Sequence, residues 1–289
     1  METVKRRVSV SGILKKLGVS YSGFRSWKNC EPSASELRRN RVKEDILDIY
    51  NSSHQNYGAP KIASQLQRSG EIISERTVGK YMRDLNIKAQ WVKPFTHTTI
   101  APDFSLKLQN ILNEQFNPTH PNAAWCSDIT YIPTARGFVY LTSVMDLFSR
   151  KIIAWTLSET LEAEHVANTV RKAMRQRNVT APLVMHSDRG SQYVSAAYLE
   201  AAAGLTLSYS KKGYPYDNAC IESFHSLIKR EWLNRFKIRD YDHAGKLVFE
   251  YIDAFYNTVR IHSHCDFCSP NDFENMYSFS PNSAFNFVG

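Results

Sequence analysis

Residues 125–209 begin with three β-rich runs and then alternate between helical and strand patterns, and this order limits the folds open to the chain. β-branched and aromatic residues dominate the runs 125–132, 138–145 and 151–157. Short connections between such runs predict a three-stranded antiparallel meander. The segments expected next are a helix at 163–177, a strand at 183–186, a helix at 195–203 and a strand at 205–209. The predicted order is βββαβαβ, which places the chain in the α/β class.

Three acidic residues each stand in a distinctive string within or just after this region. Asp128 lies in W-C-S-D-I-T-Y, Asp188 in H-S-D-R-G-S-Q-Y and Glu222 in Y-D-N-A-C-I-E-S-F. A strand, the end of a strand and the start of a helix can bring three acids to one point. Clustered carboxylates repel one another and are stable as anions only around a hard cation such as Mg²⁺. Two such ions support in-line phosphoryl transfer, so the strings predict metal-dependent chemistry on a nucleic-acid backbone.

Each acid taken alone also has an ordinary structural explanation. Asp128 suits an exposed strand position, Asp188 suits a turn because D-R-G is good turn chemistry, and Glu222 suits the positive end of a helix dipole. Two further acids are easily mistaken for catalytic ones. Asp146 is expected at the end of the second strand and Asp217 in the cap region of a helix, and we leave both outside the metal site.

The strings, in this order, resemble the DDE transposases of bacterial insertion sequences, specifically the second-reading-frame products whose core is similar to that of retroviral integrase. The resemblance extends over residues 36–273 and includes Y-N-T-V-R-I-H-S at 256–263. It implies an α/β ribonuclease H-like catalytic core, with a mixed five-stranded sheet flanked by helices, preceded by an α-helical helix-turn-helix DNA-binding region. Helices at 218–236 and 242–256 are expected to complete the core.

The resemblance also implies a mechanism. Asp128 and Asp188 would share one Mg²⁺, and Asp128 and Glu222 would hold a second, with Mn²⁺ as a substitute. The enzyme would bind the ends of an insertion sequence, cleave a strand to free a 3′-OH and transfer that strand to target DNA. However, only 33 residues separate Asp188 from Glu222, slightly fewer than is usual, and the shortening falls within 196–205. A catalytically impaired copy that acts only as a DNA-binding protein is therefore the alternative.

Several basic residues are predicted to contact DNA. Lys229 follows Glu222 by two helical turns on the same face, and the resemblance implies a DNA contact near the cleaved end, against the alternative of a solvated lysine. Lys211 and Lys212, before Gly213, suit a loop that contacts phosphates. Three helices over 36–95 suit a groove-inserting module rather than an ordinary bundle. The outward basic residues of its third helix are Arg76, Lys80 and Arg83.

The charge distribution agrees with this division. Residues 1–100 hold 18 Lys and Arg against 9 Asp and Glu, a net charge of +9, whereas residues 101–289 hold 18 against 19, a net charge of −1. We expect the basic N-terminal part to bind DNA phosphates and the rest of the chain to carry an acidic metal site. The alternative is a solvated basic face that has no partner. The predicted segments are a short helix-turn-helix at 1–35, the DNA-binding domain at 36–95, a linker with one helix (104–116) at 96–117, the core at 118–277 and a tail at 278–289.

Composition limits location and partners. No apolar run is long enough to span a membrane, and five scattered cysteines suit reduced thiols in a cytoplasmic protein that joins the nucleoid when bound to DNA. Expected partners are the terminal inverted repeats, target DNA, further copies of the chain that hold two DNA ends together, and an upstream-frame product. The string H-S-H-C-D-F-C, with Cys265 and Cys268, has spacing typical of a zinc site. We reject a zinc site because the sequence has no second Cys/His pair elsewhere.

Two rival functions remain open at this stage. One is a DNA-binding regulator without catalysis, against which the three acids count. The other is a metal-dependent nuclease that cuts but does not join, against which the basic N-terminal helices count.

Overall fold

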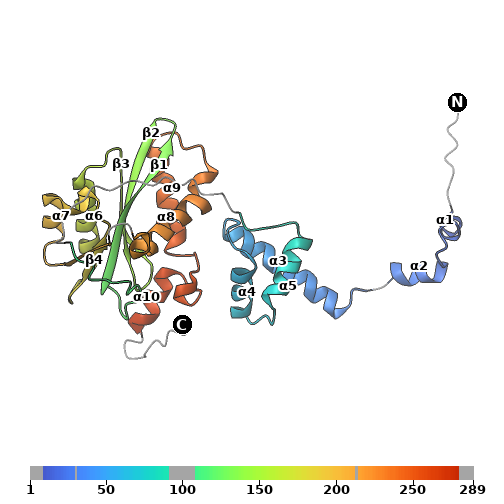
Figure 1. Ribbon diagram of the computed structural model, residues 1–289. Coiled ribbons are helices and arrows are strands. Elements are labelled where there is room, and N and C mark those ends of the chain that lie inside the picture. The colour runs from blue at the N-terminus through green and yellow to red at the C-terminus, as the bar shows by residue number, and fades with distance from the viewer. Residues whose placement is uncertain (1–8, 30, 91–107, 212–213, 280–289) are drawn as a thin grey trace.

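The computed structural model describes residues 9–29, 31–90, 108–211 and 214–279, and a mixed five-stranded sheet forms its centre (Figure 1). The strand order is β3-β2-β1-β4-β5. The first three strands form an antiparallel meander, and β4 and β5 add to β1 in parallel. The predicted meander and the βββαβαβ order are thus confirmed. The strands are β1 (Ala124–Thr134), β2 (Gly137–Asp146), β3 (Ile152–Ser158), β4 (Val184–Ser187) and β5 (Thr206–Tyr209).

Helices cover both faces of the sheet because successive strand residues point to opposite sides. On β1, Trp125 packs into the apolar layer under α6, whereas Cys126 packs into the layer under α8. Figure 1 shows the two groups of helices on opposite sides of the sheet. The first group is α6 (Ala163–Gln176) and α7 (Ala196–Ala201), and the second is α8 (Ala219–Glu231), α9 (Tyr241–Phe249) and the π-helical turn η4 (Glu250–Tyr256). The sheet and these helices together form the α/β unit.

An α-helical bundle precedes the α/β unit, and its helices begin where the sequence supplies capping chemistry. The side chains of Ser33 and Ser74 accept backbone N–H bonds at two helix starts, and Pro60 occupies the first turn of the helix between them. Val42, Ile46 and other apolar side chains meet in a buried core of their own. The bundle consists of α3 (Ala34–Ser52), α4 (Ala59–Arg68) and α5 (Glu75–Asp84), and is preceded by α1 (Val10–Lys16) and α2 (Tyr21–Lys28).

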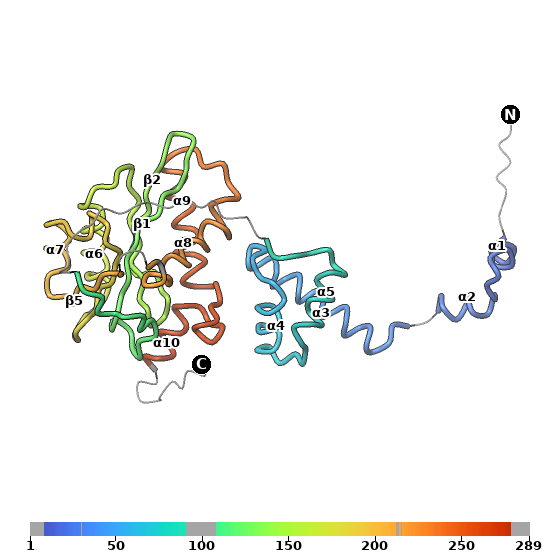
Figure 2. Tube along the Cα trace, viewed as in Figure 1, coloured from blue at the N-terminus to red at the C-terminus, as the bar shows by residue number. Residues whose placement is uncertain are grey.

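The bundle rests against the C-terminal part of the α/β unit. The buried Tyr57 hydroxyl accepts a hydrogen bond from the Ile261 N–H at 2.8 Å. Arg235 donates to the His54 carbonyl at 2.7 Å, and the His54 ring meets the Trp232 ring edge-on at 5.0 Å between centroids. Figure 2 shows the bundle trace beside the orange and red segments of the chain. These contacts include both hydrogen bonds and aromatic packing. The two units therefore share an interface and are not joined by the chain alone.

The second half of the α/β unit departs from prediction at two helices. The helix expected over 218–236 ends at Glu231, because Trp232 leaves helical geometry (φ −140°, ψ −70°) and packs against His54 and Phe236. A short 3₁₀ turn, η3 (Leu233–Arg235), follows it. The C-terminal helix α10 (Pro270–Phe279) was not predicted. Its Phe273 packs against Phe148, and this long-range contact is invisible to local periodicity.

The segment predicted as a linker also differs. Residues 96–107 lie outside the described residues, and 108–116 contain no helix, so the helix predicted there is wrong for the described part. Instead the segment pairs with β5: the Tyr209 N–H donates to the Gln109 carbonyl, and the Ser208 hydroxyl accepts the Leu112 N–H, both at 2.9 Å. Leu112 is buried in the core beneath α8 and α9. Residues 108–117 are therefore packed as part of the α/β unit.

Candidate active site

Two of the three predicted acids stand side by side because of strand register. β1 and β4 run parallel, and Ser127 pairs with Ser187. Asp128 and Asp188 are the next residues along the two neighbouring chains. Adjacent strands lie about 4.8 Å apart, so Asp128 within β1 and Asp188 just past the end of β4 are neighbours. Both follow a serine that faces the α6 side, so alternation turns both acids toward α8.

The burial of Asp188 makes its negative charge costly. Loss of solvent raises the pKa of Asp188 to about 6, and the charge of Asp128 acts in the same direction. The Gly190 N–H donates to the Asp188 carboxylate at 2.9 Å and opposes part of this rise. A carboxylate that is kept beside another carboxylate and is only partly compensated by hydrogen bonds is one that a cation would stabilise.

Glu222 joins the pair from the helix above. It lies in the first turn of α8, and its side chain is more exposed than those of Asp128 and Asp188. Partial desolvation raises the pKa of Glu222, and the charges of Asp128 and Asp188 raise it further. The three acids therefore interact electrostatically, although they come from the interior of β1, the end of β4 and a helix. The structure brings together the acids that the strings singled out.

The donor set suits a hard cation, provided that the acids act in pairs. Within the described ranges, no group of three His, Cys, Asp or Glu side chains stands close enough to hold one ion together. Two carboxylates on one ion would leave coordination positions for water and substrate phosphates, as Mg²⁺ requires. The raised pKa values of Asp188 and Glu222 mark negative charge that such ions would offset.

A histidine that the sequence interpretation overlooked contacts Asp128. The His225 Nδ1 lies 3.2 Å from Asp128 Oδ2, and its Nε2 lies 3.3 Å from the Ser143 hydroxyl. His225 follows Glu222 by three residues, so both side chains lie on one face of α8. That spacing, read beside a strand acid, is the signal that could have identified it.

Lys229 occupies the same face of α8 one turn further on. Its ammonium lies 4.3 Å from the centre of the Tyr131 ring, and the side chain is half-buried. Burial lowers the pKa of Lys229, and the nearby charge of Asp128 opposes this. The ammonium is thus packed between an aromatic ring and the acidic site, which argues against the alternative of a freely solvated lysine.

Comparison with known proteins agrees with this arrangement. Residues 37–95 match the family model of an HTH-like domain, and residues 118–215 and 203–270 match two models of an integrase core domain. The transposase for insertion sequence element IS904 from Lactococcus lactis is 35% identical over 249 residues, which cover 86% of this chain and 98% of that protein. The chain belongs to the insertion-sequence transposases. It is a DDE-type polynucleotidyl transferase with an integrase core.

Other relatives agree in extent. Transposase InsF for insertion sequence IS3A from Escherichia coli is 31% identical over 279 residues, which cover 95% of this chain and 97% of that protein. Among solved structures, the HTLV-2 integrase catalytic core domain in complex with magnesium gives a TM-score of 0.41 at 16% identity, over 54% of this chain and 97% of that one. The transposase relatives therefore match this chain along both the bundle and the core.

The short connection before Glu222 leaves the sheet of the transposase in register. α7 has six residues, and the chain turns back at Gly204, whose φ is +87°. β5 then pairs with β4 over four residues, from Val184 with Thr206 to Ser187 with Tyr209. The short α7 and the turn at Gly204 are therefore compatible with regular pairing of β5 on β4.

The remaining basic residues are placed unevenly. Lys211 follows β5, and its ammonium lies 5.7 Å from the Tyr214 ring centre, whereas Lys212 lies outside the described residues. Arg76, Lys80 and Arg83 are exposed on α5, as predicted for a basic outer face. The structure does not bring these three together with Lys229, since they lie in the other unit.

The acids left outside the metal site have structural partners. Asp146 is buried and accepts the N–H groups of Asn122 and Phe148, and burial raises its pKa to about 6. Asp217 accepts the Lys211 N–H at 2.6 Å. It therefore closes the loop before α8 rather than capping that helix, because its carboxylate points back along the chain.

The Cys/His string forms no metal site in the part of the chain that the structure describes. Cys265 is buried against Phe148 and Phe273, and its thiol donates to the Ser149 carbonyl. Burial raises the pKa of Cys265 to about 12. Its packing is that of a small hydrophobic residue.

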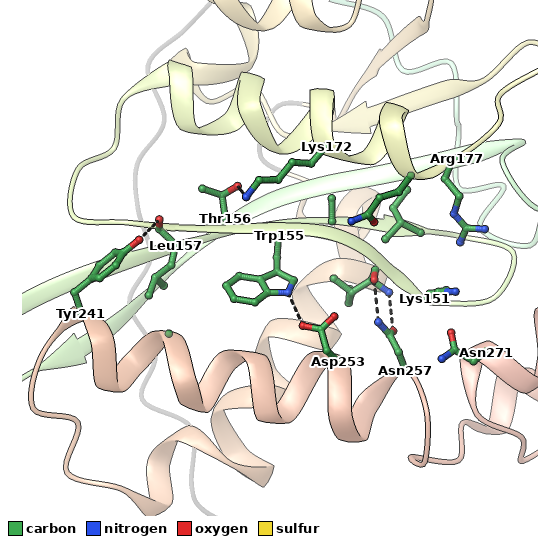
Figure 3. Close-up of a pocket in the computed structure, with 15 residues that line it drawn as sticks. Lys151, Trp155, Thr156, Leu157, Lys172, Arg177, Tyr241, Asp253, Asn257 and Asn271 are labelled. Atoms are coloured by element: carbon green, nitrogen blue, oxygen red, sulfur yellow. Dashed lines mark hydrogen bonds between the residues drawn. The ribbon is translucent and has the colours of Figure 1, made fainter.

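A hollow of the transposase lies away from the acids. It measures about 820 Å³ and follows the outer strand β3 between α6 and the α9–η4 helix (Figure 3). Trp155 donates to Asp253 at its floor, and the Asn257 amide bonds both backbone groups of Ile152. None of the three acids lines it.

Among the described helices, none is both long and apolar enough to cross a membrane.

Proposed function

We propose that this transposase binds the ends of its insertion sequence and cleaves and joins DNA strands at Asp128, Asp188 and Glu222. The observation that carries the proposal is the parallel register, which sets Asp128 beside Asp188 while both charges act on Glu222. Asp188 and Glu222, whose pKa values are raised by burial and by the charges of neighbouring carboxylates, suit metal binding better than a structural role.

Two Mg²⁺ ions, or Mn²⁺ in their place, are the proposed cofactors. Asp128 and Asp188 would hold one ion, and Asp128 and Glu222 the other. Such ions supply a Lewis acid for the scissile phosphate and an activated oxygen nucleophile. The protein's part is to hold the carboxylates at fixed positions on β1, after β4 and on α8. Hydrolysis and strand transfer share one in-line geometry, so one site can serve both.

DNA is the proposed partner of both units. The bundle, 36–95, would engage the terminal inverted repeats through Arg76, Lys80 and Arg83, whose exposure leaves them accessible to phosphates and base edges. Lys229, Lys211 and Lys212 would contact the DNA end and the target beside the acids. Further copies of the chain would hold two ends together, with an upstream-frame product as a further proposed partner.

We place the core at 108–277, since 108–117 pack on β5.

The test is a Mg²⁺-dependent reaction on DNA that carries the element's terminal repeats, with nicked and joined products scored separately. Both products are expected. Nicking without joining would identify a nuclease, and binding without either product would identify an impaired copy that acts as a DNA-binding protein.

A further inference from the structure

We infer that His225 is a positioning residue that fixes the Asp128 carboxylate for metal binding; this rests on the proposed function. Asp128 and Ser143 are direct cross-strand partners on β1 and β2. The His225 ring reaches down from α8 and spans this pair, with one nitrogen 3.2 Å from the carboxylate and the other 3.3 Å from the hydroxyl. One imidazole therefore ties α8 to two strands at the site.

Hydrogen-bond chemistry defines which group donates and which accepts between His225 and Asp128. An ionised carboxylate only accepts, so His225 Nδ1 carries the proton that it shares with Asp128 Oδ2. Ser143 is fully buried, and its hydroxyl forms a hydrogen bond with the second ring nitrogen, Nε2. With both nitrogens occupied and the ring buried, the imidazole has one orientation. Asp128 Oδ2 then has one direction in which to accept, and within the described ranges no hydrogen bond engages Oδ1, which a cation could therefore bind.

The location of the contact matters for both proposed ions. Asp128 is the acid common to the two pairs, so its rotation would disturb both at once. Carboxylates that bind metals are commonly held by a hydrogen bond from a second group, and loss of that group typically costs about 10–100-fold in metal affinity or activity. Glu222 and His225 share one face of α8, so the same helix supplies an acid to the site and an anchor for its neighbour.

Three substitutions in the full chain test the proposal. His225→Phe keeps an aromatic ring of similar size and removes both hydrogen bonds. His225→Asn keeps a donor near the position of Nδ1 and serves as the conservative rescue. Ser143→Ala removes only the far anchor. Mn²⁺ affinity is measured from the electron paramagnetic resonance signal of free Mn²⁺, without DNA, and the melting temperature is measured in chelator.

The expected result is a loss of Mn²⁺ affinity of about tenfold in His225→Phe, with most of it restored in His225→Asn. If His225→Phe does not fold, Ser143→Ala decides, and a threefold or greater loss of affinity is expected. A purely structural role would lower the melting temperature in chelator and leave Mn²⁺ affinity at the wild-type value, and this outcome would overturn the inference.

Asp128→Asn separates this inference from the proposed function. If Asp128→Asn loses Mn²⁺ binding while His225→Phe keeps it, only the positioning role is wrong. If Asp128→Asn itself binds Mn²⁺ as the wild type does, the proposed metal site is wrong, and the inference about His225 is overturned with it.

Discussion

At the scale of single residues, Asp188 shows how the proposed catalytic site opposes stability. Its pKa is raised to about 6 by burial and by Asp128. The folded protein thus binds a proton more tightly than the unfolded chain does, so ionised Asp188 destabilises the fold above about pH 6. That penalty decreases as the pH falls through 6 toward the ordinary value of about 4.

Asp188→Asn is therefore expected to stabilise the metal-free protein. At pH 8 in chelator, the free energy of unfolding should rise by about 1–3 kcal/mol, since two pKa units correspond to at most about 3 kcal/mol. At pH 4 the difference from the wild type should largely vanish. Denaturant unfolding at both pH values measures this, with the exposed Asp48→Asn as control. A variant that is less stable at pH 8 would contradict the assignment of buried, uncompensated charge.

Lys229 belongs to the same scale. Lys229→Ala should weaken binding of the DNA end by about 1–3 kcal/mol and change Mn²⁺ affinity little, because removal of one charged group from a DNA interface has that typical cost. Binding is measured on terminal-repeat and random DNA, with the exposed Lys237→Ala as control. Equal losses would mean a phosphate contact, and a selective loss on the repeat a base contact. Unchanged binding of both would exclude Lys229 from the DNA interface.

At the scale of secondary-structure elements, α5 is the surface expected to read DNA. Replacing Arg76, Lys80 and Arg83 together by alanine should reduce the slope of log affinity against log salt, by about 0.9 for each phosphate that the variant no longer neutralises. The matched control removes two arginines and one lysine that are exposed on the α/β unit: Arg175, Arg239 and Lys246. A greater effect of the control substitutions would place the main phosphate contacts on the core.

The elements also show what local sequence can and cannot specify. The β1–β3 meander and α6 were predicted to within about two residues, because β-branched runs and helical periodicity are local signals. The end of α8 at Trp232 depends on the His54 ring of the bundle, and α10 depends on Phe148, far away in sequence. Asp128, Asp188 and Glu222 were predicted from their strings. The spacing of His225 after Glu222 was also present in the sequence, but its two contacts depend on the packing of β1, β2 and α8.

At the scale of the whole molecule, the interface between bundle and core should contribute to stability. Tyr57 is 2% exposed, and its hydroxyl accepts the Ile261 N–H and donates to the Val259 carbonyl at 3.4 Å. Tyr57→Phe leaves that N–H without its partner, at a cost of about 1–3 kcal/mol. Denaturant-induced unfolding should show this loss of free energy of unfolding. The matched control is Tyr21→Phe on the exposed surface of α2. Wild-type stability in Tyr57→Phe would mean that the two units are not docked in solution.

The most direct measurement of the central claim is strand cleavage and joining by Asp128→Asn, Asp188→Asn and Glu222→Gln on terminal-repeat DNA with Mg²⁺. Each amide keeps the side-chain volume and removes the charge that holds a cation, so all three should lose cleavage and joining while binding the DNA nearly as the wild type does. Substantial Mg²⁺-dependent activity in any one of them would remove that residue from the site and contradict the three-acid account.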